Sequence, residues 1–490
     1  MSAWSALWLV AQAAEPRPAE AHVTVHPQVV VDLVYDREGE DFVESITRVG
    51  ARAQGPARDG GRWFLSVQAD YSVLVGLEDD GGDTEAATAV FVGESGWSGS
   101  VGPVYVRAGH LIERWGVMDL LPSTDVLNGQ DLRMGPLTPI DALRVPAPMI
   151  TVGAGQDKLR ATAVWLPFGA ASRVPLWGTD WSVLRQGMVE GLLSDTQAWS
   201  GDPLTLPLYQ NIAGSVADQV VALDAQSRRG LEGAMGQVGA PRPLWEAMEG
   251  GLQLKARLGP VDLEAQGAWI RSRTSAPQTD AAVVDILQSA TWPDILDKEA
   301  MTTLLQTPAV QSSRPRTAVA GGAVSALLGT FGVRAEGAHT TRLPVATHWL
   351  GMALSPMSSA GLAVDRGWGT RASAVVEGRI KHLHDPPENT LLVGTPNHIE
   401  VATAVRGSVA RDRVSVEAGA IYDVTFAELA ARPAARFRAS DTVDLGIGLI
   451  WLHSDRPAAQ TWTDAMTYTG GPSGYFGDND AVWLDARWMR

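Results

Sequence analysis

The sequence predicts an all-β protein, a single antiparallel transmembrane β-barrel of about 14–18 strands with long loop insertions, some of them helical. Three observations predict this class. Apolar and polar residues alternate along many short segments, and 18 tryptophans accompany only 8 phenylalanines and 7 tyrosines. No stretch reaches the roughly 18 apolar residues that a membrane helix needs. A mean hydropathy of -0.02 fits a barrel, because only every second residue of its strands faces lipid.

The clearest hairpin lies between residues 252 and 269, with Gly259-Pro260 as its turn. Its apolar residues share one face and are expected to face lipid: Leu252, Leu254, Leu258, Val261, Leu263 and Trp269. The other face carries Gln253, Lys255, Arg257, Asp262 and Glu264, which are expected to face the interior. Residues 317–333 are uncharged but interrupted by glycines, and they predict two strands around a Gly329-Thr330 turn.

The same alternation predicts further strands over 103–111, 158–168, 401–409, 414–422, 443–451 and 482–488. The excess of tryptophan is typical of membrane interfaces, where the ring is half in apolar surroundings and its N–H reaches water. A barrel of this size encloses a lumen wide enough for small solutes unless loops fill it.

The domain organisation follows from the segments that do not alternate. Residues 1–14 are predicted to be a signal peptide that lacks the usual basic n-region, since residues 3–11 are apolar and Ala11-Gln12-Ala13 matches a cleavage site. The missing region indicates either a true start further upstream or an apolar N-terminal stub. Residues 15–490 are predicted to form one barrel with insertions at 112–157, 169–249 and 274–315. Within the last insertion, residues 280–306 are expected to be helical.

Charge and composition exclude several functions. A net charge of -16 argues against nucleic-acid binding, which needs a basic surface. The absence of cysteine excludes thiol chemistry and is common in exported proteins. His382 and His384 share one strand face, and Gly477 to Asp480 resembles part of a calcium loop, but neither has enough ligands at the right spacing for a metal site. The sequence predicts no cofactor, no metal and no enzymatic activity.

The segment between the strands at 103–111 and 158–168 is dense in charged groups. The candidate site residues are Arg114, Asp119, Asp125, Asn128, Asp131 and Arg133, with Trp115 as a packing anchor. Polar segments of this kind cannot face lipid, so we expect this one to fold into or across the lumen. Two roles remain open: the charges select solutes in a narrow passage, or Arg–Asp pairs fix the loop.

The same region resembles a known group of proteins. The pattern R-W-G-x-x-D, D-x-L-N-x-x-D-L-R and W-L-P-F is present as Arg114-Trp115-Gly116 with Asp119, as Asp125 to Arg133, and as Trp165 to Phe168. It resembles an uncharacterised family of large porin-like outer-membrane β-barrels of Gram-negative bacteria. The resemblance covers about residues 100–185 and implies a fold and a location rather than an activity. Gly129 stands where members usually have proline.

The expected function is a porin-like outer-membrane channel that passes a small or amphiphilic solute. Two alternatives remain: an outer-membrane component of a lipid or hydrophobic-compound export system, or a secreted, soluble all-β protein that binds or cleaves glycans. The expected partners are outer-membrane lipid, a solute that the sequence does not identify, and, for the export alternative, a periplasmic protein. The sequence does not give the oligomeric state.

Overall fold

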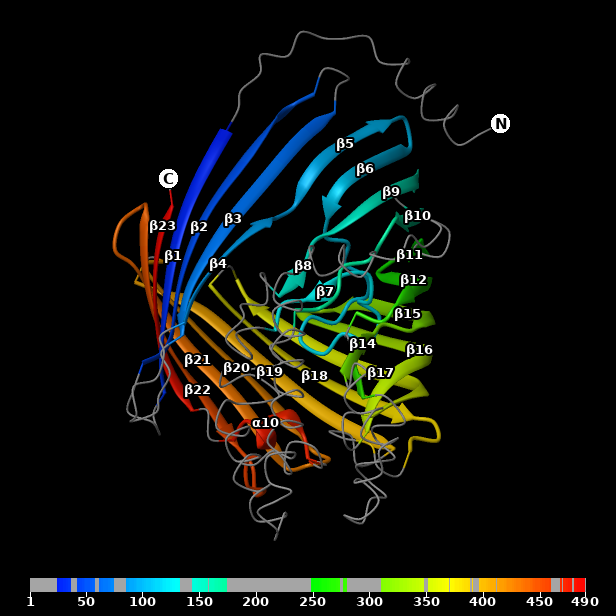
Figure 1. Ribbon diagram of the computed structural model, residues 1–490. Helices are drawn as coiled ribbons and strands as arrows, with labels where there is room; N and C mark the ends of the chain where they lie inside the picture. Colours follow the sequence, from blue (N-terminus) through cyan, green and yellow to red (C-terminus); the bar gives the residue numbers. More distant parts are fainter. Residues whose placement is uncertain are drawn as a thin grey trace, which may run out of the picture.

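The computed structural model describes most of the predicted barrel (Figure 1). The described residues are 24–36, 42–57, 61–74, 85–132, 143–156, 158–173, 248–273, 276–279, 310–347, 351–369, 371–387, 390, 396–410, 412–459, 468, 470–477 and 480–489. The predicted signal peptide, the predicted helix at 280–306 and most of the insertion at 169–249 lie outside these residues.

Strands make up most of the described chain. In the first half they are β1 (Thr24–Asp36), β2 (Phe42–Pro56), β3 (Arg62–Leu74), β4 (Glu85–Val92), β5 (Ser95–Val101), β6 (Val104–Leu111), β7 (Gly129–Gln130), β8 (Arg144–Val145), β9 (Ala147–Gln156), β10 (Leu159–Leu166), β11 (Glu249–Leu258) and β12 (Val261–Arg271). In the second half they are β13 (Ala276–Thr279), β14 (Val310–Ser313), β15 (Arg316–Leu328), β16 (Phe331–Thr347), β17 (Gly351–Trp368), β18 (Ala372–Leu383), β19 (Asn397–Val409), β20 (Val414–Asp423), β21 (Glu428–Arg438), β22 (Val443–His453) and β23 (Ala481–Met489). A short helix, α10 (Pro472–Tyr475), precedes β23.

The large sheet is antiparallel and closes on itself. Each wall strand pairs with the next along the chain, and β23 pairs with β1, with Trp488 opposite Val29. The sheet contains 19 described strands. β4 and β5 both pair with β3 and continue one another, so the wall has 18 positions. The predicted fold class is confirmed, and the closed sheet leaves no unpaired strand edge.

The outside of the wall is apolar. Leu252, Leu254, Leu258, Leu263 and Trp269 of the predicted hairpin are all exposed, which confirms their outward orientation. Exposed tryptophans lie at both ends of the wall strands: Trp368 and Trp488 near one end, and Trp165, Trp269 and Trp451 near the other. An apolar band between two levels of aromatic residues is the exterior of a membrane-spanning barrel.

The two ends of the barrel differ in their connections. At one end the strands are joined by tight turns, such as Gly259-Pro260 and Gly329-Thr330, which lie where the sequence predicts them. Gly259 and Gly329 both have a φ of 64°, a conformation that favours glycine. The ends of β1 and β23 that carry Thr24 and Met489 also lie at this end. All the long connections leave the opposite end, including 112–146, 167–248, 272–315 and 454–480.

One expectation needs correction. The insertion predicted at 112–157 is shorter, because Ala147–Gln156 forms wall strand β9, which pairs with β6 and β10. Its sequence, APMITVGAGQ, has too few polar residues for the alternation to be visible. Gln253 and Glu264 point inward as predicted, and both side chains are buried. The Lys255 side chain on the same inward face is half-exposed to the lumen. No helix in the described ranges is long and apolar enough to cross a membrane.

Candidate constriction inside the barrel

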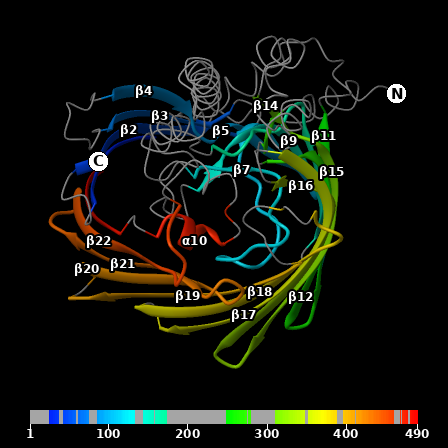
Figure 2. The same cartoon turned by 60° about the horizontal axis from the view of Figure 1, so that its bottom comes forward.

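Residues 112–128, which we call the inner segment, lie inside the barrel (Figure 2). The segment leaves β6 at the end with the long connections and packs against the inward face of the wall. Its apolar side chains make this packing favourable: Trp115, Met118, Leu121 and Leu127 are all at most 2% exposed. Leu127 and Trp115 join a cluster with wall residues, and Met118 and Leu121 pack near Ala363 and Ala402.

Three wall glutamates accept hydrogen bonds from the backbone of the inner segment. Glu377 on β18 accepts from the N–H groups of Asp119, Leu120 and Leu121 at 2.8–2.9 Å. These bonds satisfy donors that a loop without regular structure leaves unpaired, and hydrogen bonds to an ionised acceptor are stronger than neutral ones.

Glu336 on β16 acts in the same way. It accepts from the N–H groups of Val117 at 2.8 Å and Met118 at 3.1 Å, and also from Ser123. Glu264 on β12 accepts from Gly116 at 3.1 Å. The inner segment is therefore held along its length by carboxylates spaced over the wall.

Wall glycines make room for this close approach. A Cβ atom on Gly251 of β11 would lie 2.4 Å from the Trp115 ring, and one on Gly361 of β17 would lie 2.4 Å from the Met118 sulfur. Within the segment itself, Gly116 has a φ of 90°, and a Cβ there would meet Thr124 Oγ1 at 2.1 Å. Larger residues at these positions would displace the inner segment from its position against the wall.

Two wall arginines donate hydrogen bonds to backbone carbonyls of the inner segment. Arg379 on β18 donates to the Pro122 carbonyl at 2.8 Å and pairs with Glu400 at 2.7 Å. Arg334 on β16 donates to the Val117 carbonyl at 2.5 Å and pairs with the Asp119 carboxylate at 2.7 Å. Arg334 therefore contacts both the backbone and a charged side chain of the segment.

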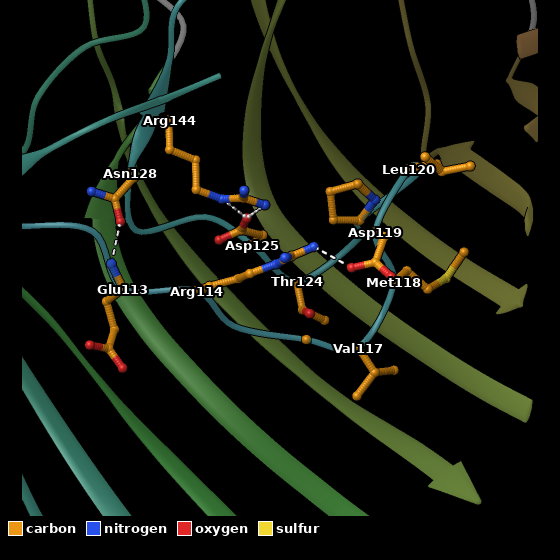
Figure 3. Close-up of polar contacts among 12 residues, drawn as sticks. Glu113, Arg114, Val117, Met118, Asp119, Leu120, Thr124, Asp125, Asn128 and Arg144 are labelled. Carbon is orange, nitrogen blue, oxygen red and sulfur yellow. Dashed lines mark hydrogen bonds and ion pairs between the residues drawn. The ribbon is translucent and has the colours of Figure 1, made fainter. Parts of the chain in front are cut away.

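The predicted site residues fall into two environments. Arg114 and Asp119 form an ion pair at 2.6 Å on the lumen side, where their side chains are 43% and 46% exposed (Figure 3). Asp125 instead pairs with Arg144 at 2.6 Å and is only 5% exposed. Asp119 is in contact with the lumen, and Asp125 is inside the packed part of the loop.

Asn128 lies at the base of the inner segment. Its amide nitrogen donates to the carbonyls of Leu111 and Val145, each at 3.0 Å, and its amide oxygen accepts from the Glu113 N–H at 2.9 Å. The side chain thus connects the end of β6, the start of the segment and β8. Nearly all of its hydrogen-bonding capacity is used inside the protein.

Asp131 lies beyond the inner segment. Asp131 pairs with Arg173 at 2.9 Å, next to hydrogen bonds that join the two backbones. This contact ties the chain after β7 to the chain after β10, so it lies apart from the Arg114–Asp119 pair. Arg133 lies outside the described residues.

Burial and neighbouring charges shift the acidity of the loop carboxyls in different directions. Burial raises the pKa of Asp125 despite the charge of Arg144. Burial also raises the pKa of Glu113, and the charges of Arg107, Lys255 and Arg160 only partly oppose this. For Asp119, burial is outweighed by the hydrogen bond and charge of Arg334 and by Arg114, so its pKa lies below the usual value.

The histidines weighed as metal ligands lie on the outward face of the wall. His382 contacts Asn397 at 2.8 Å, and His384 contacts Ser358 at 2.9 Å, which also contacts His339. The rings of His382 and His384 are 4.6 Å apart. Within the described ranges, no group of three or more His, Cys, Asp or Glu side chains has the geometry to hold a metal ion.

Sequence reasoning missed the wall residues that receive the inner segment. Glu336, Glu377, Arg334 and Arg379 are far from the segment along the chain, and each occupies an ordinary inward position of its strand. One signal was available: a glutamate on the inward face of a strand rich in small residues, as in Gly332 to Gly337. Such a residue needs a partner once it is buried.

No protein-family model and no curated protein matches the chain. Among solved structures, it is similar to Pseudomonas aeruginosa OccK7 (OpdD) at 8% identity and a TM-score of 0.46, covering 96% of this chain and 99% of that chain. It is also similar to Pseudomonas aeruginosa OpdK with vanillate, at 7% identity and a TM-score of 0.45, covering 96% and 98%. At this level of similarity the function has to be derived from the barrel's own residues.

Proposed function

We propose that this protein is a porin-like channel of the outer membrane, through which small hydrophilic solutes pass passively. The observation that carries the proposal is the inner segment, which is packed and hydrogen-bonded inside a closed barrel of 18 wall positions. A wall of this size encloses a lumen, and a loop fixed inside it narrows the lumen without closing the wall. No covalent step is part of this function.

The location follows from the exterior of the wall and from the asymmetry of its ends. Barrels of bacterial outer membranes have an apolar band with aromatic girdles, short periplasmic turns and longer extracellular loops. We therefore assign the turns such as Gly259-Pro260 to the periplasmic side. The inner segment then enters the lumen from the extracellular side. The proposed membership of the porin-like family that the motif resembles rests on the same architecture.

The roles of the candidate residues differ in this proposal. Asp119, with Arg114 and Arg334, contributes charge to the passage, because fixed charges in a narrow water-filled pore sort solutes by their sign. Asp125, Asn128 and Asp131 hold the loop, because their polar groups are used by protein partners. Selectivity and loop fixation are thus assigned to different residues.

Conductance in planar lipid bilayers tests the proposal directly. Purified, refolded protein should produce stepwise increases in current in potassium chloride. The refolded state is verified by a gel mobility shift on boiling, which is typical of stable outer-membrane barrels. A folded barrel that gives no conductance would overturn the channel function, and lipid bound to such a barrel would favour the export alternative.

A further inference from the structure

The lumen contains a basic cavity that none of the functions above uses. It lies at the end of the tight turns, has a volume of about 640 Å³ and is lined by β2, β3, β5, β6 and β10. Its polar lining includes Gln54, Arg62, Ser98, Tyr105, Arg107 and Arg160. Metabolite-sized ligands commonly occupy cavities of roughly 300–1,000 Å³.

The strand register places this lining on the inward face. Arg62 is opposite Ser98, and Ser98 is opposite Arg107 across the β5–β6 pair. Arg107 lies on the same face of β6 as Leu111, which is fully buried in the cluster around Trp115. The neighbouring residues Leu65 and Val101 are exposed on the outer side. The cavity is therefore open to the lumen and not to lipid.

Neighbouring side chains fix the orientation of one guanidinium in the cavity, that of Arg160. The Arg160 guanidinium stacks on the Tyr105 ring, 4.1 Å from its centre. The Tyr105 hydroxyl is hydrogen-bonded to Thr162 at 2.8 Å. The ring also lies against Gly153, where a Cβ would be 1.7 Å from a ring carbon. Arg160 is thus oriented by a fixed aromatic ring.

The charges of the cavity do not cancel. Arg107 pairs with Glu94 at 3.0 Å and with Glu113 at 3.2 Å. Among the described residues, no carboxylate lies within ion-pair distance of Arg62 or Arg160. Among the described residues, the three guanidiniums of the lining and the two carboxylates paired with Arg107 leave a net charge of one positive unit, in a chain whose overall net charge is -16. A site with this excess favours a monovalent anion over a neutral solute or a cation.

We propose that this cavity binds small, hydroxylated monocarboxylates on their way through the barrel. The guanidiniums of Arg62 and Arg160 recognise the carboxylate through charge-assisted hydrogen bonds. Ser98, Ser100 and Gln54 offer hydrogen bonds to the hydroxyl groups. This inference names a substrate class and rests on the proposed channel function.

Binding of potassium gluconate to the folded barrel in detergent, measured by calorimetry, tests the site without requiring transport. The test variant is R62Q/R160Q. The matched control is R406Q/R438Q, which removes two inward guanidiniums near the same end from β19 and β21. We expect gluconate to bind the wild type, and to bind R62Q/R160Q at least about tenfold more weakly, as expected when charge-assisted hydrogen bonds are lost. The control should stay within about twofold of the wild type.

Three outcomes would overturn the inference: no gluconate binding to the wild type, unchanged affinity in R62Q/R160Q, or an equal loss in R406Q/R438Q. The last would show that only the overall charge of the lumen matters. Glucose at the same concentration should bind more weakly than gluconate, because it lacks the carboxylate. A barrel that binds gluconate but conducts no ions would overturn the channel function alone, so the two failures are distinguishable.

Discussion

The carboxylate of Glu377 accepts a hydrogen bond from the backbone N–H of Leu121 at 2.8 Å, although 256 residues separate them in sequence. Glu377 is 0% exposed, and the same carboxylate also receives the N–H groups of Asp119 and Leu120. A buried carboxylate without such donors would be strongly unfavourable. The wall strand and the inner segment therefore stabilise each other, and the segment has one defined position in the lumen.

Neutralising Asp119 should change selectivity with little effect on folding. Its carboxylate is half-exposed to the lumen, so D119N removes a negative charge from the passage and should reduce the permeability of potassium relative to chloride. The reversal potential in a potassium chloride gradient measures this ratio. We expect a shift toward anions, and an unchanged ratio would show that Asp119 does not contribute charge to the passage.

Neutralising Asp125 should lower the stability of the barrel and leave its ion selectivity unchanged. Asp125 is buried with Arg144, and the loss of one partner of a buried pair leaves an uncompensated charge that costs roughly 3–5 kcal/mol. D125N should therefore lower the unfolding temperature while leaving the reversal potential of the folded fraction unchanged. A selectivity shift as large as that of D119N, with normal stability, would contradict the division between the two residues.

Lowering the pH should increase the preference of the channel for anions, and this change should begin at a higher pH than the one at which an ordinary glutamate takes up a proton. Burial raises the pKa of Glu113, so this carboxyl takes up a proton at a higher pH than usual and leaves Arg107 less compensated. The pKa of Asp119 is lowered, so it stays ionised over the same range. Reversal potentials measured from pH 7 down to about 4.5 should shift toward anions.

The matched variant for this titration is E113Q. It should show the anion preference already at pH 7 and should lose the shift over that range. If E113Q responds to pH as the wild type does, another group is responsible. If the wild type shows no shift, the protonation of Glu113 does not affect the passage.

Replacing Leu254 with arginine should destabilise the barrel through its lipid-facing surface. Leu254 is 45% exposed on the outside, in the middle of β11, and an arginine at the bilayer midplane costs roughly 2–4 kcal/mol. E417R places an arginine on the inward, exposed face of β20 and should be tolerated. Equilibrium unfolding in lipid vesicles compares the two, and equal stability would refute the orientation of the wall.

The wall was predictable from the sequence because alternation is a local signal. Leu252, Leu254 and Leu263 alternate with polar residues, and a lipid-facing position must be apolar whatever its neighbours are. β9 was missed because its residues are nearly all apolar or small. The membership of Arg114 and Asp119 in an inward loop was also predictable, because charged groups of an irregular segment cannot face lipid.

The contacts of that loop were not predictable. Whether Asp125 reaches the lumen or Arg144 depends on how the segment bends, and the partners Glu336 and Glu377 are set by the register of strands more than 200 residues away. The periodicity of a strand shows which of its residues face inward, but it does not show which of those residues contact a loop. The separation of selectivity from loop fixation therefore needed the three-dimensional structure.

Whether the inner segment forms the constriction can be measured as the single-channel conductance of a variant in which the segment is released from the wall. E336A/E377A removes the acceptors of the Val117, Met118, Asp119, Leu120 and Leu121 N–H groups, and each unpaired donor costs roughly 1–3 kcal/mol. E336Q/E377Q keeps a weaker acceptor at each position, and E417Q serves as a control that removes an inward charge without a contact to the segment.

We expect E336A/E377A, verified as a folded barrel by its mobility shift on boiling, to conduct more current than the wild type and to be less selective between potassium and chloride. E336Q/E377Q should lie between the two, and E417Q should match the wild type in conductance. If folded E336A/E377A has the same single-channel conductance and the same selectivity as the wild type, the inner segment does not form the constriction.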